Sequence, residues 1–428
     1  MINNLKPLIF ITGSFLIGIM SSISIVSSGI FIIMLCILTA CIYDKTNIAT
    51  MYFLTLSLFP ILIIGQQISI ILLPIFLIIF IINFIIYKHK KLKIYNISLI
   101  LIFYSLNILS LLISSNINYA IQNIGKLTAC ILIYISTVNL EVITRNYDLN
   151  TIKKILKYII LTSAIVCTVL IYKYIFVYRV KYVGINLIYE TEAGKNQLAF
   201  FLATLLPFCI FCSYKNYKKI WNIILKISSI ILIIAAILSN SRGVIVSVIV
   251  SSIITAIITN DKKIIRYMFL AVGLIIIFII INSKENQIIY SNTIGSNQIR
   301  LSLIKFSIKT FLENLVIGIG IGDFYQIPRY IGLNVLISHN DYLQIMVELG
   351  ICGIILFMGI MYNFLRNLLS IKSIIDKKDM RLYQSILCSN ISIMIYLLFI
   401  NSYNIILVWF IFGISMKVYD SYIEMKKV

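Results

Sequence analysis

The chain has 428 residues, 61% of them hydrophobic, and carries a net charge of +21 from 36 Lys and Arg against 15 Asp and Glu. Only 12% of its residues are charged, about half the share of a soluble domain, which excludes a soluble globular fold. Most of the basic residues lie in short tracts between apolar runs, where they act as topology signals, so the charge does not indicate nucleic-acid binding.

The apolar runs repeatedly approach the roughly 20 residues that an α-helix needs to cross a hydrocarbon core. Unbroken runs such as Ile68–Tyr87 lack the alternation of a barrel strand, so we predict an all-α polytopic membrane protein. About fourteen spans are expected; the first three are short or polar-interrupted, which leaves twelve or thirteen open. The spans begin near Leu8, Ile23, Ala49, Ile68, Ile97, Ile121, Ile155, Asn196, Ile223, Gly243, Tyr267, Leu343, Gln384 and Asn404.

The charge of the connections alternates along the chain. Connections after the fourth, sixth, eighth, tenth and twelfth spans and the C-terminal tail are basic, whereas those after the first, third, fifth, ninth and thirteenth hold almost no charge. The positive-inside rule therefore predicts a multi-pass membrane protein with both termini in the cytoplasm. The N-terminal run lacks a small-residue cleavage pattern, so we expect it to be a retained span.

Two connections are long, and both are expected to face outward: about Tyr178–Lys195 and about Ser283–Tyr342. Long loops are usually functional or disordered. The chain is accordingly divided into a transmembrane bundle of about eleven spans (1–282), one large extracytoplasmic loop (283–342) and C-terminal transmembrane helices (343–428).

The large loop has the pattern of ordered structure. One set of residues at helical spacing is apolar: Leu301, Ile304, Ile308 and Phe311. Another set is polar: Ser302, Lys305 and Lys309. This predicts an amphipathic helix at the outer interface or over the mouth of the bundle. The following Gly318–Asp323 predicts a turn with close backbone approach rather than a dinucleotide fingerprint, since no strand and helix flank it.

A short outer turn, Asn240–Gly243, lies between two apolar helices. Ser241 or Asn240 can cap the helix that follows. The positive end of that helix and the Arg242 guanidinium converge, which suits a phosphate or diphosphate. The alternative for Arg242 is that its side chain extends to lipid headgroups and binds nothing else.

Three further residues lie on the same predicted side. His339 precedes the twelfth span and could serve as a general base, or could be only a polar residue at the start of a helix. Glu348 lies slightly deeper in that span and is either a functional acid or paired with a nearby Lys or Arg. Arg300 opens the loop helix and adds a third cation to this side.

Four motifs in this order resemble the O-antigen ligase and polymerase family. Ile237–Val244 and Ser338–Gly353 resemble the family signature, and Asn297–Phe324 between them is similar to its large periplasmic loop. Upstream, Lys195–Phe200 resembles the start of the span that precedes the Ser-Arg-Gly turn. The resemblance covers roughly residues 190–365, and three spans follow the loop, as in the family.

The resemblance implies an inverting glycosyltransferase of the C-type membrane architecture that needs no metal or other cofactor. Its donor would be an oligosaccharide on undecaprenyl diphosphate, presented at the outer leaflet, so the active site would face the periplasm. Arg242 and Arg300 would bind the donor diphosphate and stabilise the charge that develops as it departs. His339 would lie beside the acceptor and either take the hydroxyl proton or orient the hydroxyl.

Eight further residues are predicted to contact substrate, with the three lysines as auxiliary phosphate contacts: Lys195, Asn196, Ser241, Lys305, Lys309, Asn340, Tyr342 and Glu348.

The acceptor stays open. Ligation to lipid A–core and polymerisation onto a second lipid-linked glycan share the same donor chemistry, and a Gram-positive envelope polymer is a further alternative. A transporter or flippase of lipid-linked sugars would place charges along the middle of the membrane. Here the informative charges gather at the outer boundary, which disfavours transport.

Overall fold

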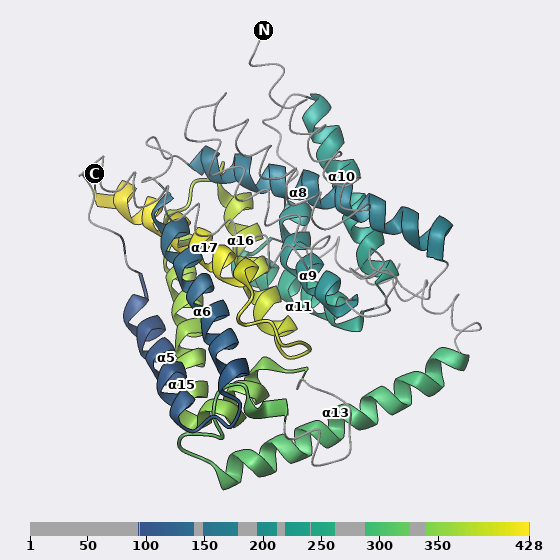
Figure 1. Cartoon of the computed structure of the whole chain (residues 1–428). Helices are drawn as coiled ribbons and strands as arrows, with labels where there is room; N and C mark the ends of the chain where they lie inside the picture. Colours follow the sequence, from purple (N-terminus) through teal and green to yellow (C-terminus); the bar gives the residue numbers. More distant parts are fainter. Residues whose placement is uncertain are drawn as a thin grey trace, which may run out of the picture.

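The computed structural model describes residues 93, 95–140, 149–178, 195–211, 219–239, 241–261, 287–325 and 339–427. Within these ranges the chain is helical and contains no strand, which confirms the predicted fold class (Figure 1). The first four predicted spans, the eleventh near Tyr267, Asn240 and most of the connection at Tyr178–Lys195 lie outside the described residues.

The helices begin close to where hydropathy placed the spans. They are α5 (Ile97–Leu109), α6 (Ile117–Val138), α8 (Leu149–Tyr172), α9 (Lys195–Phe211), α10 (Lys219–Leu238), α11 (Arg242–Thr259), α13 (Gln287–Glu313), α15 (Asp341–Ser370), α16 (Met380–Tyr396) and α17 (Ile406–Lys427). Among the described residues, 6 helical segments are long and apolar enough to cross a membrane, and α5 and α9 are shorter apolar helices.

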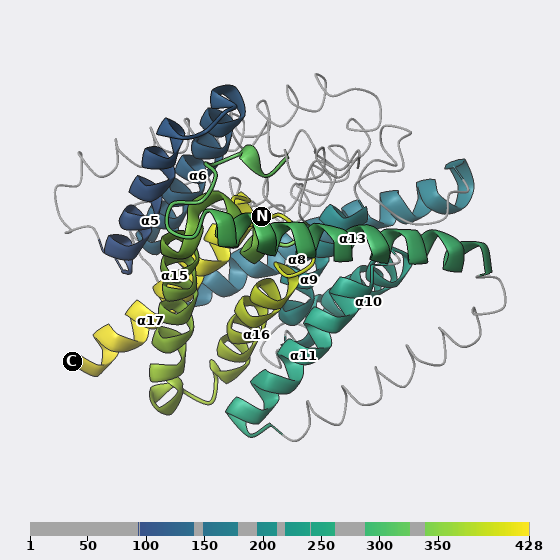
Figure 2. The same ribbon diagram turned by 90° about the horizontal axis from the view of Figure 1, so that it is seen from below.

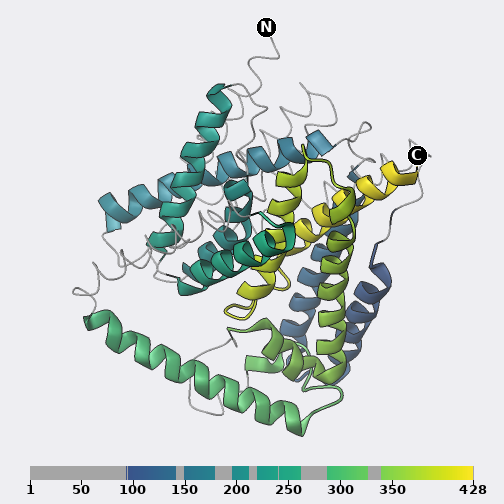
Figure 3. The ribbon, with the colours of Figure 1, turned by 180° about the vertical axis from the view of Figure 1, so that it is seen from behind.

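The bundle is built from neighbouring helices that pack side by side, and α13 lies obliquely across one end of it (Figure 1). Seen from below, α13 crosses this end from α15 toward the side of α10 (Figure 2). We call it the α13 end. Helix α16 packs against both α9 and α11, and the view from behind shows α16 and α11 next to each other (Figure 3).

Helix α11 has its small polar residues inside and its large apolar residues outside. Ser247, Ser251 and Thr255 are buried against neighbouring helices, whereas Val250 and Ile257 are exposed. This arrangement suits a membrane, because lipid solvates large aliphatic side chains while small residues let helices approach closely.

Ion pairs join the helices at the end of the bundle away from α13. The Lys93 ammonium lies 2.6 Å from the Asp420 carboxylate, and the Arg381 guanidinium lies 2.9 Å from that of Asp261. Lys153 pairs with Asp379. These contacts tie α11 to α16, α8 to the start of α16, and the segment before α5 to α17.

Helix α15 is broken near its start, which the sequence prediction of one span from Leu343 did not include. Gly350 has φ 66° and ψ −161°, so a short helix precedes a long one. The break frees the carbonyls of Val347 and Glu348, which accept hydrogen bonds from the N–H groups of Ile319 and Gly320, both at 3.0 Å. Backbone groups buried in a membrane protein need such partners.

The predicted turn at Gly318–Asp323 is confirmed as a close backbone approach. A Cβ on Gly318 would lie 2.5 Å from the Glu348 carbonyl, and one on Gly320 would lie 2.8 Å from Ser114 Cα. Only glycine fits such contacts with the positive φ values of 76° and 106° found here.

Helix α13 confirms that the loop contains a helix. Of its predicted apolar set, Phe311 packs against the buried Phe324 and Val347, whereas Leu301, Ile304 and Ile308 are exposed. Leu303 and Ser307, outside that set, are buried. An apolar stripe can remain exposed in a protein surrounded by lipid, where hydrophobicity alone does not drive helix packing.

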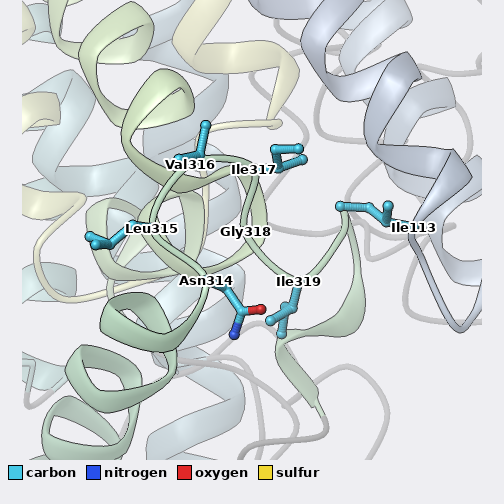
Figure 4. A pocket seen from close by; sticks show the side chains of 7 residues that line it. All are labelled: Ile113, Asn314, Leu315, Val316, Ile317, Gly318 and Ile319. Carbon is cyan, nitrogen blue, oxygen red and sulfur yellow. The ribbon is translucent and has the colours of Figure 1, made fainter.

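A cavity of about 510 Å³ lies between the turn that follows α13 and the turn after α5 (Figure 4). It is lined by Ile113 and by residues 314–319. The close view shows Asn314 and Ile319 on the turn after α13 and Ile113 on the other turn. None of the predicted site residues lines this cavity.

Candidate functional site

The C-terminal end of α16 joins two motifs that are far apart in the sequence. The Ser241 hydroxyl lies 3.1 Å from the Tyr396 hydroxyl. The Asp341 N–H donates to the Leu397 carbonyl at 2.9 Å, and the Tyr342 hydroxyl donates to the Met394 carbonyl at 2.8 Å. The turn that carries Arg242 and the segment that carries His339 are therefore attached to the same helix end.

The start of α9 belongs to the same assembly. The Tyr396 hydroxyl donates to the Asn196 carbonyl at 3.2 Å. Asn196 is half-buried there, whereas the side chain of Lys195 lies outside the described part of the chain. The predicted motif at Lys195–Phe200 thus meets the Ser-Arg-Gly turn through a tyrosine that neither motif contains.

Arg300 approaches this assembly from α13. It is half-buried, one turn before Leu303 on the side of α13 that packs inward. Its guanidinium interacts electrostatically with both the His339 imidazole and the Tyr396 hydroxyl. The structure therefore brings Arg300, His339 and the Ser241–Arg242 turn to one place.

Arg242 is the first residue of α11, and its side chain is exposed. Ser241 occupies the N-cap position with extended backbone, but its side chain makes no capping hydrogen bond. The prediction that Ser241 caps this helix is therefore wrong, because its hydroxyl is directed to Tyr396 instead; the alternative, Asn240, lies outside the described residues. The helix start beside Arg242 thus receives no cap from Ser241.

His339 has an unusual backbone and an unpartnered ring nitrogen. Its φ is 54°, in the left-handed region that non-glycine residues seldom adopt. Nδ1 is buried without a hydrogen-bond partner among the residues that the structure describes. Burial, and secondly the Arg300 guanidinium, lower the pKa of the imidazole to about 4, so His339 is neutral at pH 7.

Asn340, Tyr342 and Glu348 each have a structural partner. The Asn340 carboxamide oxygen accepts from the Leu343 N–H at 3.1 Å and caps α15. Glu348 is buried; its carboxylate accepts from the Phe324 N–H at 3.3 Å and from the Gln344 amide at 3.0 Å. Glu348 has no Lys or Arg partner among the described residues, so the alternative of an ion pair is not found there.

Lys305 and Lys309 are not brought to Arg300. Both are exposed, and at 100° per residue they lie on the side of α13 opposite Leu303 and Ser307. Lys309 instead lies 3.9 Å from Glu313 in an exposed pair. Their role as phosphate contacts stays a prediction, and their position on the exposed side of α13, away from Arg300, does not support it.

Tyr396 is the residue of this site that the sequence did not indicate. Tyrosine near the end of an apolar span is common at membrane interfaces, so its position alone carried no signal. Only the contacts of its hydroxyl and ring with α9 and α11 distinguish it from the other tyrosines.

Comparison with protein families gives one match. Residues 227–358 match the family model described as O-antigen ligase. The matched stretch includes Arg242, Arg300 and His339, and it confirms the resemblance to the O-antigen ligase and polymerase family. A search of curated proteins found no match.

Proposed function

From the match of residues 227–358 to the O-antigen ligase family, we propose that this protein is a membrane glycosyltransferase. It transfers a glycan from undecaprenyl diphosphate to an acceptor hydroxyl at the extracytoplasmic leaflet, with inversion and without a metal. The observation that supports this most directly is the convergence of Arg300, His339 and the Ser241–Arg242 turn at one end of the bundle.

The α13 end is proposed to be extracytoplasmic. Basic residues gather at the other end, around the connection between α15 and α16, near the starts of α5 and α8, and beside Asp420 of α17: Lys93, Lys153, Lys372, Lys377, Lys378, Arg381 and Lys417. Basic connections remain in the cytoplasm in multi-pass proteins. This distribution supports an active site that faces the periplasm of a bacterial inner membrane.

The two arginines have different surroundings, which suit two functions toward one diphosphate. Arg242 is exposed at a helix start and can meet a ligand whose lipid tail remains in the bilayer. Arg300 is half-buried and belongs to α13, which lies across the end of the bundle. A planar guanidinium can form two parallel hydrogen bonds to phosphate oxygens, so the pair would hold the diphosphate from two sides.

In the proposed reaction the acceptor oxygen forms a bond to the anomeric carbon as the bond from that carbon to the diphosphate oxygen breaks. The electron pair leaves with the diphosphate, and preplaced guanidiniums stabilise the developing negative charge. The hydroxyl proton goes to His339 or is released after His339 has oriented the hydroxyl.

A rise in the pKa of His339 on donor binding would make the imidazole a better acceptor for that proton. Arg300 is one of the two causes that lower this pKa in the free protein. A diphosphate next to Arg300 would offset that positive charge and favour the protonated imidazole. Donor binding would therefore prepare His339 for proton transfer.

The test supplies purified protein with a synthetic undecaprenyl-diphosphate oligosaccharide, with and without a lipid A–core acceptor. Product that forms only with core indicates a ligase, whereas chain extension without core indicates a polymerase that uses a second lipid-linked glycan. The absence of both products, together with movement of the lipid across vesicles, would reject the transferase in favour of a flippase.

A further inference from the structure

The Tyr396 hydroxyl joins the starts of two helices. It donates its only proton to the Asn196 carbonyl at 3.2 Å. The Ser241 hydroxyl, 3.1 Å away, must then donate to the tyrosine oxygen. One side chain at the end of α16 thus connects the first turn of α9 with the residue that precedes Arg242.

The Tyr396 ring is held as firmly as its hydroxyl. Its centroid lies 5.6 Å from that of Phe200 on α9. A Cβ on Gly243 would lie 3.1 Å from a ring carbon, so only a glycine at this position lets the start of α11 approach the ring without displacement. The ring thereby fixes where α11 begins relative to α9 and α16.

Helices α9, α11 and α16 are also connected farther from the α13 end. The Ser389 hydroxyl donates to the Thr204 carbonyl at 2.7 Å, and the Ser392 hydroxyl donates to the Ala203 carbonyl at 2.8 Å. At the far end Arg381 pairs with Asp261. Because the helices are held along their length, the Tyr396 hydroxyl determines the position of the α11 start alone and not the packing of the whole bundle.

We propose that Tyr396 is a positioning residue for the diphosphate: by holding Ser241 it places Arg242, at the start of α11, opposite Arg300 and His339. This inference rests on the proposed function. It also accounts for the missing cap, since a serine that donates to Tyr396 is turned away from the N–H groups of its own helix.

The first test compares Tyr396→Phe with Tyr383→Phe. Tyr383 is on the same helix and is equally buried, but its hydroxyl has no hydrogen-bond partner among the described residues. We expect Tyr396→Phe to raise the donor KM about 3- to 10-fold, the effect of one or two hydrogen bonds. Its kcat should change less than about twofold, because donor binding is what is lost. Tyr383→Phe should leave both constants unchanged.

The second test asks whether Ser241 and Tyr396 act as one unit. Ser241→Ala should raise the donor KM. Ser241→Thr keeps the hydroxyl and should therefore have a donor KM below that of Ser241→Ala, and the double variant should be no worse than Tyr396→Phe. Three results would overturn the inference: an unchanged donor KM in Tyr396→Phe, an equal rise in Tyr383→Phe, or multiplied losses in the double variant.

The binding of undecaprenyl-diphosphate oligosaccharide to each purified variant separates this inference from the proposed function. If the wild-type protein transfers glycan and Tyr396→Phe has the same donor KM, only the positioning role is overturned. A wild-type protein that binds the donor without forming product overturns the transfer, and the Kd values of the variants then decide the positioning role. A wild-type protein that does not bind overturns both.

Discussion

The Asp323 carboxylate accepts hydrogen bonds from the N–H group of Ser115 at 2.6 Å and from its hydroxyl at 3.0 Å, across 208 positions of sequence. A third bond comes from the Asn116 N–H at 3.3 Å. The glycine-rich turn after α13 is thereby attached to the turn between α5 and α6. This attachment and the hydrogen bonds to the break in α15 together hold the glycine-rich turn in place.

We expect Asp323→Ala to release this turn without unfolding the bundle. Hydrogen bonds to a charged group contribute about 1.5–3 kcal/mol, so hydrogen exchange at residues 314–324 should accelerate roughly tenfold or more. Asp376→Ala is the control, because its side chain is 56% exposed and forms its ion pair with the exposed Lys378. If hydrogen exchange at these residues is unchanged in Asp323→Ala, the backbone hydrogen bonds to α15 are sufficient to hold the turn.

Gly350→Ala should destabilise the protein, whereas Gly359→Ala on the same helix should not. Gly350 has φ 66°, and a Cβ there would lie 2.4 Å from the Val316 carbonyl oxygen. Backbone with positive φ and ψ near 180° is essentially confined to glycine and costs about 1–3 kcal/mol for a residue with a side chain. At Gly359 the nearest atom to a new Cβ is 3.9 Å away. Thermal unfolding in detergent compares the two, and equal melting temperatures would contradict the break at Gly350.

Arg242→Lys should reduce kcat/KM roughly 100-fold while leaving the fold intact. A lysine keeps the charge but does not reproduce two parallel hydrogen bonds to a phosphate. Arg366→Lys, an exposed arginine on α15, is the matched control and should keep wild-type activity. Wild-type turnover in Arg242→Lys would show that Arg242 only reaches toward lipid headgroups.

The pH dependence of kcat/KM should report the low pKa of His339 in the free protein. Because burial and Arg300 lower this pKa to about 4, the imidazole is neutral above roughly pH 5. We therefore expect kcat/KM to stay level as the pH falls from 8 to about 5 and to decline only below that. A decline centred near the ordinary value of about 6.5 would show that His339 is not held in this environment.

The His339 prediction has its own control in Arg300→Gln. This variant removes the second cause of the low pKa, so the acidic decline should shift toward higher pH. The direction follows from charge: without the guanidinium the protonated imidazole is less disfavoured. A shift toward lower pH would contradict the placement of Arg300 beside His339.

Hydropathy predicted the described spans correctly because a chain in lipid must satisfy its backbone within helices, and that demand leaves long apolar runs in the sequence. The starts predicted near Ile97, Ile155 and Asn404 fall within a few residues of α5, α8 and α17 or inside them. The residues of the candidate site could likewise be proposed from local motifs, since Arg242, Arg300 and His339 each lie within a short recognisable stretch.

Local sequence patterns did not predict contacts that a residue makes with another helix. Of the predicted apolar face of α13, only Phe311 packs against buried residues. Leu301, Ile304 and Ile308 are exposed, while Leu303 and Ser307 from outside that set are buried. Ser241 has the right residue type for a cap, yet a tyrosine 155 positions away takes its hydroxyl. Periodicity and propensity describe one element at a time, and neither records a competing partner on another helix.

What the sequence by itself determined is therefore the class of the protein, its described spans and the residue types that can meet a diphosphate. Only the tertiary structure decided that α15 breaks at Gly350, that Glu348 accepts from the glycine-rich turn, and that Tyr396 joins α9 to α11. The physical reason is that these features depend on single backbone groups and hydroxyls meeting across helices, and such pairings leave no repeat in the sequence.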